Sequence, residues 1–225
     1  VANTMASPYY RFDGADDYIA VADSNDLSFG DGSADSAFTI SSWAKMDDAT
    51  YFHIVAKGVF TPTAEYVFFV GGADNLSLEL FDESVDAYEK AVCNSTLTAY
   101  EGQWVHLVVT YDGRGGSSAN AGITFYVNGI SQAVTLSDSN TYVAMENLGA
   151  DVHIIRSNTT YGNGSLAGLK IWNLELSATE VKELYSGASV PFKYKGASGP
   201  LWTGDDITFA SDTGNWTNGG TWTVS

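Results

Sequence analysis

Residues 38–46 read FTISSWAKM and residues 104–111 read WVHLVVTY, and these two stretches decide the fold class. Apolar residues recur at every second position in both, as Phe38 and Ile40 do in the first and Leu107 does in the second. Successive side chains of a β-strand point to opposite faces, so this alternation predicts strands that turn one face to a core.

Similar short runs follow one another along the chain and are separated by Gly, Asp, Asn and Ser. Residues 123–128 (ITFYVN) precede Gly129, and the pair Asn128-Gly129 predicts a two-residue hairpin turn because both residues tolerate positive φ. Further runs lie at residues 9–13, 18–22, 51–57, 66–71, 76–81, 152–157 and 166–173. About a dozen strands with turn residues between them predict an antiparallel sandwich or barrel.

One segment predicts a helix. Residues 177–180 read SATE, a capping box in which the Ser177 hydroxyl accepts the N3 amide and Glu180 reaches back. Leu176 and Val181 stand at the two positions of a hydrophobic staple. Gly187 is placed where a left-handed residue would end the helix.

The composition excludes several classes of function. The 225 residues carry 27 acidic against 10 basic side chains, a formal net charge of −17. A field of that sign repels phosphate backbones and anionic lipid, so we expect no nucleic-acid partner. No apolar run approaches the roughly 20 residues that cross a bilayer, so we expect no membrane insertion. Cys93 is the single cysteine, which rules out an intrachain disulfide and a zinc site built from cysteines.

The composition changes near residue 198. Residues 198–225 contain Trp202, Trp216 and Trp222 among many Gly, Thr and Ser. We therefore divide the chain into a main β-domain, residues 1–197, and a tail, residues 198–225. The tail is either an extra strand or the start of a second β-domain.

Seven blocks of the chain, taken in order, resemble the laminin G/pentraxin-like branch of the concanavalin A-like jelly rolls. They are FDGADDYIAV at 12–21, FTISSWAK at 38–45, IVAKG at 54–58, WVHLVVTYDG at 104–113, FYVNG at 125–129, GSLAGLKIWN at 164–173 and LSATE at 176–180. The resemblance spans about residues 8–187 and implies an all-β, antiparallel two-sheet jelly-roll β-sandwich with one short C-terminal helix. The version it resembles most occurs in bacterial surface proteins and bacteriophage virion proteins, which implies an extracellular or virion-surface location.

Members of this family often hold a structural calcium ion, and the residues here support that expectation only in part. Asp13, Asp16 and Asp17 supply clustered carboxylates of the kind that Ca²⁺ prefers, and Asp13 and Asp17 are the predicted ligands. The family usually has two adjacent carboxylates where this chain has Ala167 and Gly168. Those two positions therefore cannot contribute to a charged site.

A glycan site needs exposed aromatic faces beside amide or carboxylate groups. Four residues in turn-rich sequence near one end of the predicted sandwich meet that description, Tyr142, Asn158, Tyr161 and Asn163, and Trp172 of the run 166–173 is a fifth candidate that can approach them. Trp43, His106 and Tyr126 form an alternative set, on a strand face that is either a sugar-binding concavity or a surface covered by loops. For both sets, ordinary packing is the competing interpretation.

The sequence offers no converging acid and base. Glycosidases need two carboxylates that share a substrate, but Glu83, Asp86 and Glu89 are spaced by three, and such neighbours face opposite sides of a strand. We interpret residues 79–89 as a solvated acidic loop. The three histidines are isolated from one another in the sequence. We therefore expect that the chain is not an enzyme.

Three functions remain, in decreasing order of support. The first is a non-catalytic recognition module that binds a surface glycan or polysaccharide. The second is a structural subunit that decorates a virion or filament, whose tail pairs with neighbouring chains by strand addition. The third is a polysaccharide hydrolase or lyase.

Overall fold

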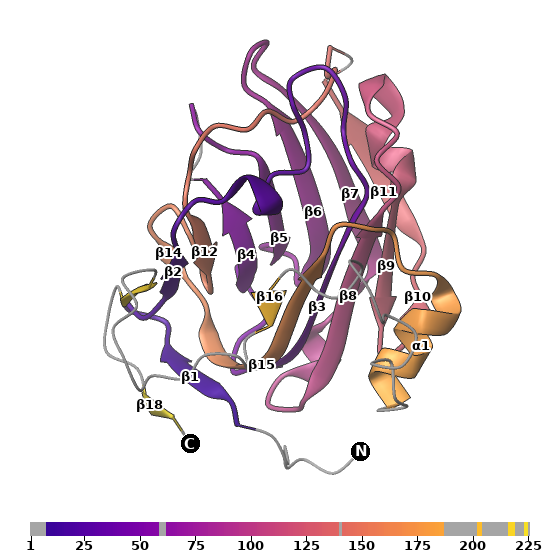
Figure 1. Ribbon diagram of the computed structural model, residues 1–225. Helices are drawn as coiled ribbons and strands as arrows, with labels where there is room; N and C mark the ends of the chain where they lie inside the picture. The colour runs from indigo at the N-terminus through magenta and orange to yellow at the C-terminus, as the bar shows by residue number, and fades with distance from the viewer. Residues whose placement is uncertain are drawn as a thin grey trace.

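Two antiparallel β-sheets pack face to face, and a single short α-helix lies against the outer side of one of them (Figure 1). The computed structural model describes residues 8–58, 62–139 and 141–186, together with the backbone of residues 202–203, 216–218 and 223–224. The two-sheet architecture confirms the predicted sandwich. Among the described residues, no helix has the length and apolar character needed to span a bilayer.

The first sheet pairs several strands that lie far apart in the sequence, as jelly rolls do. Its order is β10 (Ile130–Ser131), β9 (Ile123–Val127), β8 (Val105–Tyr111), β3 (Phe38–Met46), β15 (Asn163–Trp172), β1 (Tyr10–Asp13) and β18 (Thr223–Val224). The short strand β16 (Trp202–Thr203) also pairs with β15. Because β15 lies between β1 and β3, the end of the main domain is joined to its beginning.

The second sheet faces the first across the core. Its order is β11 (Val134–Asp138), β7 (Ala87–Thr96), β6 (Asn75–Asp82), β5 (Tyr66–Val70), β4 (His53–Lys57), β12 (Val152–Ile154), β2 (Ile19–Val21) and β17 (Trp216–Asn218). A separate hairpin joins β13 (Arg156–Ser157) to β14 (Thr160–Tyr161). Three 3₁₀ turns complete the described elements: η1 (Asn25–Leu27), η2 (Thr98–Tyr100) and η3 (Gly116–Gly122).

The core lies between the sheets where side-chain parity predicted it. Phe38, Leu107 and Phe125 are fully buried and belong to one apolar cluster with residues of the second sheet. The rings of Phe68 on β5 and Phe125 on β9 stack across the sandwich with centroids 6.3 Å apart. Burying such side chains stabilises the fold by about 1.5–3 kcal/mol each.

The helix α1 (Ala178–Ser186) covers the opposite face of the first sheet. Its capping box forms as predicted, since the Ser177 amide donates to Glu180 Oε2 at 2.8 Å and the Glu180 amide to Ser177 Oγ at 3.4 Å. Leu176 and Val181 pack with Tyr126 in a second apolar cluster. The predicted C-terminal residue Gly187 lies outside the described residues.

Residues 141–151 have no regular secondary structure and are held mainly by side chains of the sandwich. Asp82 accepts the Val143 amide at 2.9 Å, Asp35 accepts the Met145 amide at 2.7 Å, and Glu65 accepts the Leu148 amide at 3.0 Å. These acidic side chains replace the strand partner that the segment lacks. We call this arrangement the carboxylate clamp.

The tail residues with a described backbone pair with strands of this same chain. β16 pairs with β15, β17 with β2 and β18 with β1, all antiparallel. Thus β17 and β18 extend the two sheets at the side where β2 and β1 lie (Figure 1). The division at residue 197 remains a prediction.

The covering of the first sheet by α1 can be tested with Leu176→Ala. Leu176 is buried between helix and sheet, so removing its side chain should lower the free energy of unfolding by about 2–5 kcal/mol. Ile130→Ala is the matched control, because Ile130 is 67% exposed and its loss should change stability by less than about 0.5 kcal/mol. Urea denaturation measures both, and equal effects of the two substitutions would contradict the packing.

Candidate functional site

The loop that joins β1 to β2 meets the β13–β14 hairpin at one edge of the sandwich. Asp13 at the end of β1 is the register partner of Asn163 at the start of β15. Gly14 follows with φ +80°, and a Cβ there would lie 2.8 Å from the Asn163 Cβ. A glycine therefore permits both the turn and this close approach. Strands β2, β12 and β14 lie together at this edge (Figure 1).

An aromatic cluster with one cation lies at this edge, and we call it the Arg156 cluster. The Arg156 Cζ lies 4.4 Å from the ring centroid of Tyr18 and 5.5 Å from that of Tyr161. The centroids of the two tyrosine rings are 6.1 Å apart, and that of the His153 ring lies 5.6 Å from that of Tyr18 in an edge-to-face arrangement. All four side chains are half-buried, so part of each meets solvent. Cation–π attraction holds the guanidinium in this position.

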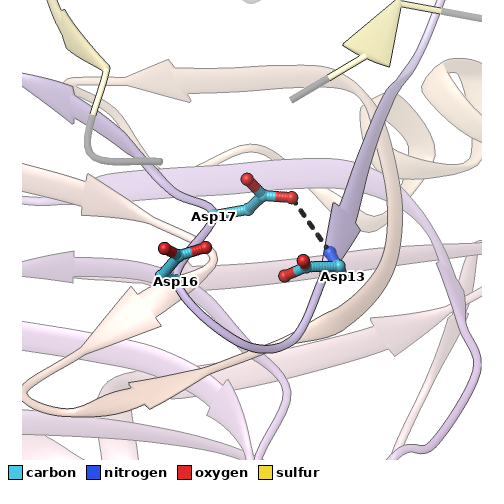
Figure 2. Close-up of side chains that lie close together, drawn as sticks. All are labelled: Asp13, Asp16 and Asp17. Atoms are coloured by element: carbon cyan, nitrogen blue, oxygen red, sulfur yellow. Dashed lines mark hydrogen bonds between the residues drawn. The ribbon is translucent and has the colours of Figure 1, made fainter. Parts of the chain in front are cut away.

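Three carboxylates converge in the adjoining loop, as Figure 2 shows. One oxygen each from Asp13, Asp16 and Asp17 lies within 4.8 Å of the others. Asp17 Oδ2 accepts the Asp13 amide at 3.2 Å, whereas the buried Asp17 Oδ1 has no hydrogen-bond partner. Burial and the neighbouring Asp13 and Asp16 charges raise the pKa of Asp17, against the lowering effect of the Asp13 amide.

This donor set fits a calcium ion. Ca²⁺ is bound by oxygen ligands, carboxylates above all, and a cation would satisfy the orphaned Asp17 Oδ1 and relieve the repulsion within the trio. Ala167 and Gly168 add no ligand, because they line an apolar hollow with Phe12 and Ile19. Of the predicted ligands, Asp13 and Asp17 thus lie together, with Asp16 as a third.

The five predicted glycan-site residues do not form one site. Tyr161 belongs to the Arg156 cluster, Asn158 is exposed in the same hairpin, and Asn163 Oδ1 accepts from Arg11 at 3.2 Å. Tyr142 and Trp172 are instead 2% and 1% exposed, so neither ring is available to a sugar. The Tyr142 hydroxyl donates to Asp35, and Trp172 packs under α1.

The alternative set lies beneath α1 and forms no open concavity. The rings of Trp43, His106 and Tyr185 of the helix form one cluster, with Trp43 5.0 Å from His106 and 5.8 Å from Tyr185. His106 shares a 2.9 Å hydrogen bond with the Ser41 hydroxyl in the buried interior. Burial, and to a smaller degree the Lys170 charge, lowers the pKa of His106 to about 4. The sequence left open whether this face is a sugar-binding concavity or a covered surface. It is covered, by α1 and by the segment that precedes it.

The acidic segment at residues 79–89 is a hairpin of β6 and β7, and the prediction of a solvated loop was wrong for two of its members. Asp82 and Glu89 are buried, where Asp82 accepts the Val143 amide and Glu89 the Asn120 amide. Glu79 pairs with Lys90 at 2.5 Å. These carboxylates therefore accept from donors of the protein, because their positions in the hairpin direct them toward neighbouring segments.

Another carboxylate with a perturbed pKa lies at the end of the sandwich. Burial, with a smaller contribution from Asp82, raises the pKa of Asp35. Its oxygens accept from the Tyr111 and Tyr142 hydroxyls and from the Met145 amide. Both oxygens are thus occupied by protein donors, which marks Asp35 as a structural acid.

The outer face of the second sheet carries a second polar and aromatic surface. The rings of His53 and Phe69 stack 5.4 Å apart, and Lys90 lies over Phe69 while it pairs with Glu79. The charges of Lys90 and Glu79 on this surface already neutralise each other. Arg156 differs, since no carboxylate of the described residues pairs with it, and this contrast favours the hairpin edge as the binding site.

Sequence reasoning missed Tyr18, His153 and Arg156. Each stands in a run that predicted a strand, where an aromatic or charged residue can face either way. A usable indication was Arg156 itself, because a basic residue is uncommon in a chain with 27 acidic and 10 basic side chains.

The two sheets and their strand order define a concanavalin A-like jelly roll. The family model for the concanavalin A-like lectin/glucanases superfamily, of laminin G type, matches residues 13–182. The chain belongs to this superfamily. A comparison with curated protein sequences gives no match.

Solved structures show the same fold at low sequence identity. A heptameric SAP-like pentraxin from Limulus polyphemus is 16% identical, with a TM-score of 0.53 over 95% of this chain and 96% of the pentraxin. The binding domain of botulinum neurotoxin serotype G is 16% identical, with a TM-score of 0.58 over 84% of this chain and 44% of that one. A putative carbohydrate binding protein from Bacteroides ovatus is 16% identical, with a TM-score of 0.50 over 78% of this chain and 46% of that one.

The burial of His106 predicts a loss of stability in acid. An unfolded histidine takes up a proton near pH 6.5 but folded His106 only near pH 4, so stability falls as the pH falls between these values. His106→Gln should reduce the stability lost between pH 7 and pH 4 by an amount on the order of 3 kcal/mol.

The measurement is urea denaturation of both proteins across this pH range. The comparison between them removes the opposite contribution of Glu65, whose pKa is raised by burial. Identical pH profiles, or an imidazole of His106 that titrates near pH 6.5 by NMR, would contradict the buried neutral histidine.

Proposed function

We propose that this chain is a non-catalytic carbohydrate-binding module of an extracellular protein, such as an adhesin or a phage host-recognition protein. The observation that carries the proposal is the Arg156 cluster, where Tyr18 and Tyr161 surround a fixed donor at an edge of the sandwich. Aromatic rings bind the apolar faces of sugars, and a few placed polar groups select their hydroxyl or acidic substituents. The superfamily to which the chain belongs includes lectins.

The partners of the carboxylates support a function without catalysis. A retaining glycosidase requires two carboxyl groups about 5–5.5 Å apart with access to substrate. Asp35, Asp82 and Glu89 are instead engaged with amides and hydroxyls of the chain. The trio of Asp13, Asp16 and Asp17 suits a cation better than a proton transfer, since three like charges converge there.

An assembly role is the second candidate. The tail strands β16, β17 and β18 pair with β15, β2 and β1 by main-chain contacts, which a tail from a neighbouring copy could form as well. Such an exchange would make the chain a structural subunit of a virion or filament. A strictly monomeric mass at high protein concentration would remove this candidate without affecting glycan binding.

Glycan binding is tested by a screen of neutral and acidic polysaccharides, with and without calcium, followed by calorimetry on the positive ligands. We expect saturable binding without release of reducing ends. Tyr161→Ala should weaken it about fivefold or more, because stacking on an aromatic ring contributes about 1 kcal/mol or more.

Tyr88→Ala is the matched control, since Tyr88 is 39% exposed on β7, which three strands separate from β12 in the second sheet, and it should not affect affinity. Absence of any binding partner in the screen would overturn the proposed function. Cleavage of a glycan by the pure protein would overturn its non-catalytic character.

We also propose that Asp13, Asp16 and Asp17 hold one structural calcium ion. Ligand binding to the folded state alone stabilises it by about 2.7 kcal/mol at a concentration 100 times the Kd. We therefore expect the melting temperature to rise with Ca²⁺ and to fall back with chelator. Asp17→Asn should abolish the rise, because the orphaned carboxylate oxygen loses its charge.

Asp86→Asn is the control for this experiment, since Asp86 is an exposed acid in the β6–β7 turn. It should keep the full calcium response. A wild-type protein that does not respond to calcium, or an unchanged response in Asp17→Asn, would contradict the site.

A further inference from the structure

We propose that Arg156 binds the carboxylate of an acidic sugar, so that the ligand of this module is a uronic-acid-type glycan. The inference rests on the proposed function and deepens it, because it names the ligand class and the group that selects it. Three observations support it: the Arg156 guanidinium is fixed, the guanidinium has no acidic partner among the described residues, and two aromatic rings suited to a sugar flank it.

The guanidinium of Arg156 is held in one orientation before any ligand arrives. Its Nε donates to the Asn158 carbonyl at 2.8 Å, and Asn158 has a left-handed φ of +53°. Tyr18 lies against the guanidinium at 4.4 Å. These contacts engage Nε and one face, which leaves the two terminal nitrogens as donors for a ligand. A fixed fork loses little freedom when it binds a carboxylate.

Among the described residues, Arg156 has no acidic partner, as is also true of Lys45, Lys170 and Lys182. Five ion pairs occur among the described residues: Arg11–Asp47, Lys57–Asp23, Lys57–Glu65, Lys90–Glu79 and Arg114–Asp112. Arg156 takes part in none of them, although acids outnumber bases by 27 to 10. A half-buried guanidinium without a counter-ion is a site where an anion from outside completes the pairing.

The net charge of −17 opposes an anionic ligand at long range but not at contact. At physiological ionic strength, exposed charges farther apart than about 8 Å are largely screened. The charges that act on the adjoining His153 ring are those of Arg156 and, more weakly, Asp151. The charges that act on Asp17 in the acidic trio are those of Asp13 and Asp16 and, more weakly, Arg11, and Arg156 is not among them. The field at the His153 ring is therefore set mainly by Arg156.

The rings favour a sugar acid over a bare anion. Tyr18 and Tyr161 are half-buried and their rings are inclined at 52°, so they present apolar surface beside the fork. A pyranose ring can lie on such surface while its carboxylate reaches the guanidinium. A free inorganic anion or an acidic peptide would use the fork and leave the aromatic surface unused.

The test compares matched ligands that differ only in charge. Galacturonic-acid and glucuronic-acid oligomers are titrated by calorimetry against the full chain, each as the free acid and as the methyl ester. We expect at least one free acid to bind about tenfold tighter than its ester. Added salt should weaken the binding of the acid and leave that of the ester unchanged.

Variants then assign the effect to Arg156. Arg156→Gln should bring the affinity for the acid down to that for the ester, whereas Arg156→Lys should keep part of the preference because the charge remains. Lys182→Gln, which removes an exposed cation from α1, should leave the preference unchanged. If Arg156→Gln fails to fold, Arg156→Lys and the salt dependence decide.

Each outcome separates this inference from the function on which it rests. Equal binding of acid and ester, an unchanged preference in Arg156→Gln, or preferred binding of poly-glutamate or a sulfated sugar would overturn the acidic-sugar site. Neutral glycans that bind while every acid fails would do the same and leave the carbohydrate-binding function standing. Failure of all glycans would overturn the function itself.

Discussion

The carboxylate clamp positions much of what surrounds the candidate site. Asp35, Asp82 and Glu65 accept amide hydrogen bonds from residues 141–151, a segment that has no strand partner of its own. A hydrogen bond to a charged group contributes about 1.5–3 kcal/mol, and an unsatisfied buried amide costs a similar amount. The clamp thus fixes where β12 begins. β12 in turn pairs with β2 and β4, and the hairpin that carries Arg156 follows directly.

The acids of the clamp and the acids of the trio therefore have different roles in this strongly acidic chain. Those of the clamp hold the framework by accepting amide hydrogen bonds of the protein. The trio of Asp13, Asp16 and Asp17 lies beside the hairpin and suits a cation, while Arg156 suits an anion. A framework fixed by hydrogen bonds can present the trio and Arg156 at its edge without moving when a ligand binds. This rigidity favours ligand binding over catalysis.

The sequence predicts what depends on near neighbours. Alternation places Phe38 and Leu107 in the core, and the capping box at Ser177 places the start of α1, because both depend on residues a few positions apart. It does not predict that Tyr142 is buried, since its partner Asp35 lies 107 positions away. It likewise cannot pair Tyr18 with Arg156, which meet only when β2 and β12 come together.

The most direct test of the account is a chemical-shift map of the isotopically labelled chain with its tightest glycan. The account predicts that the largest shifts occur at Tyr18, Arg156 and Tyr161, with the buried Tyr142 and Trp172 little affected. Largest shifts on the outer face of the second sheet, at His53, Phe69 and Lys90, would contradict it.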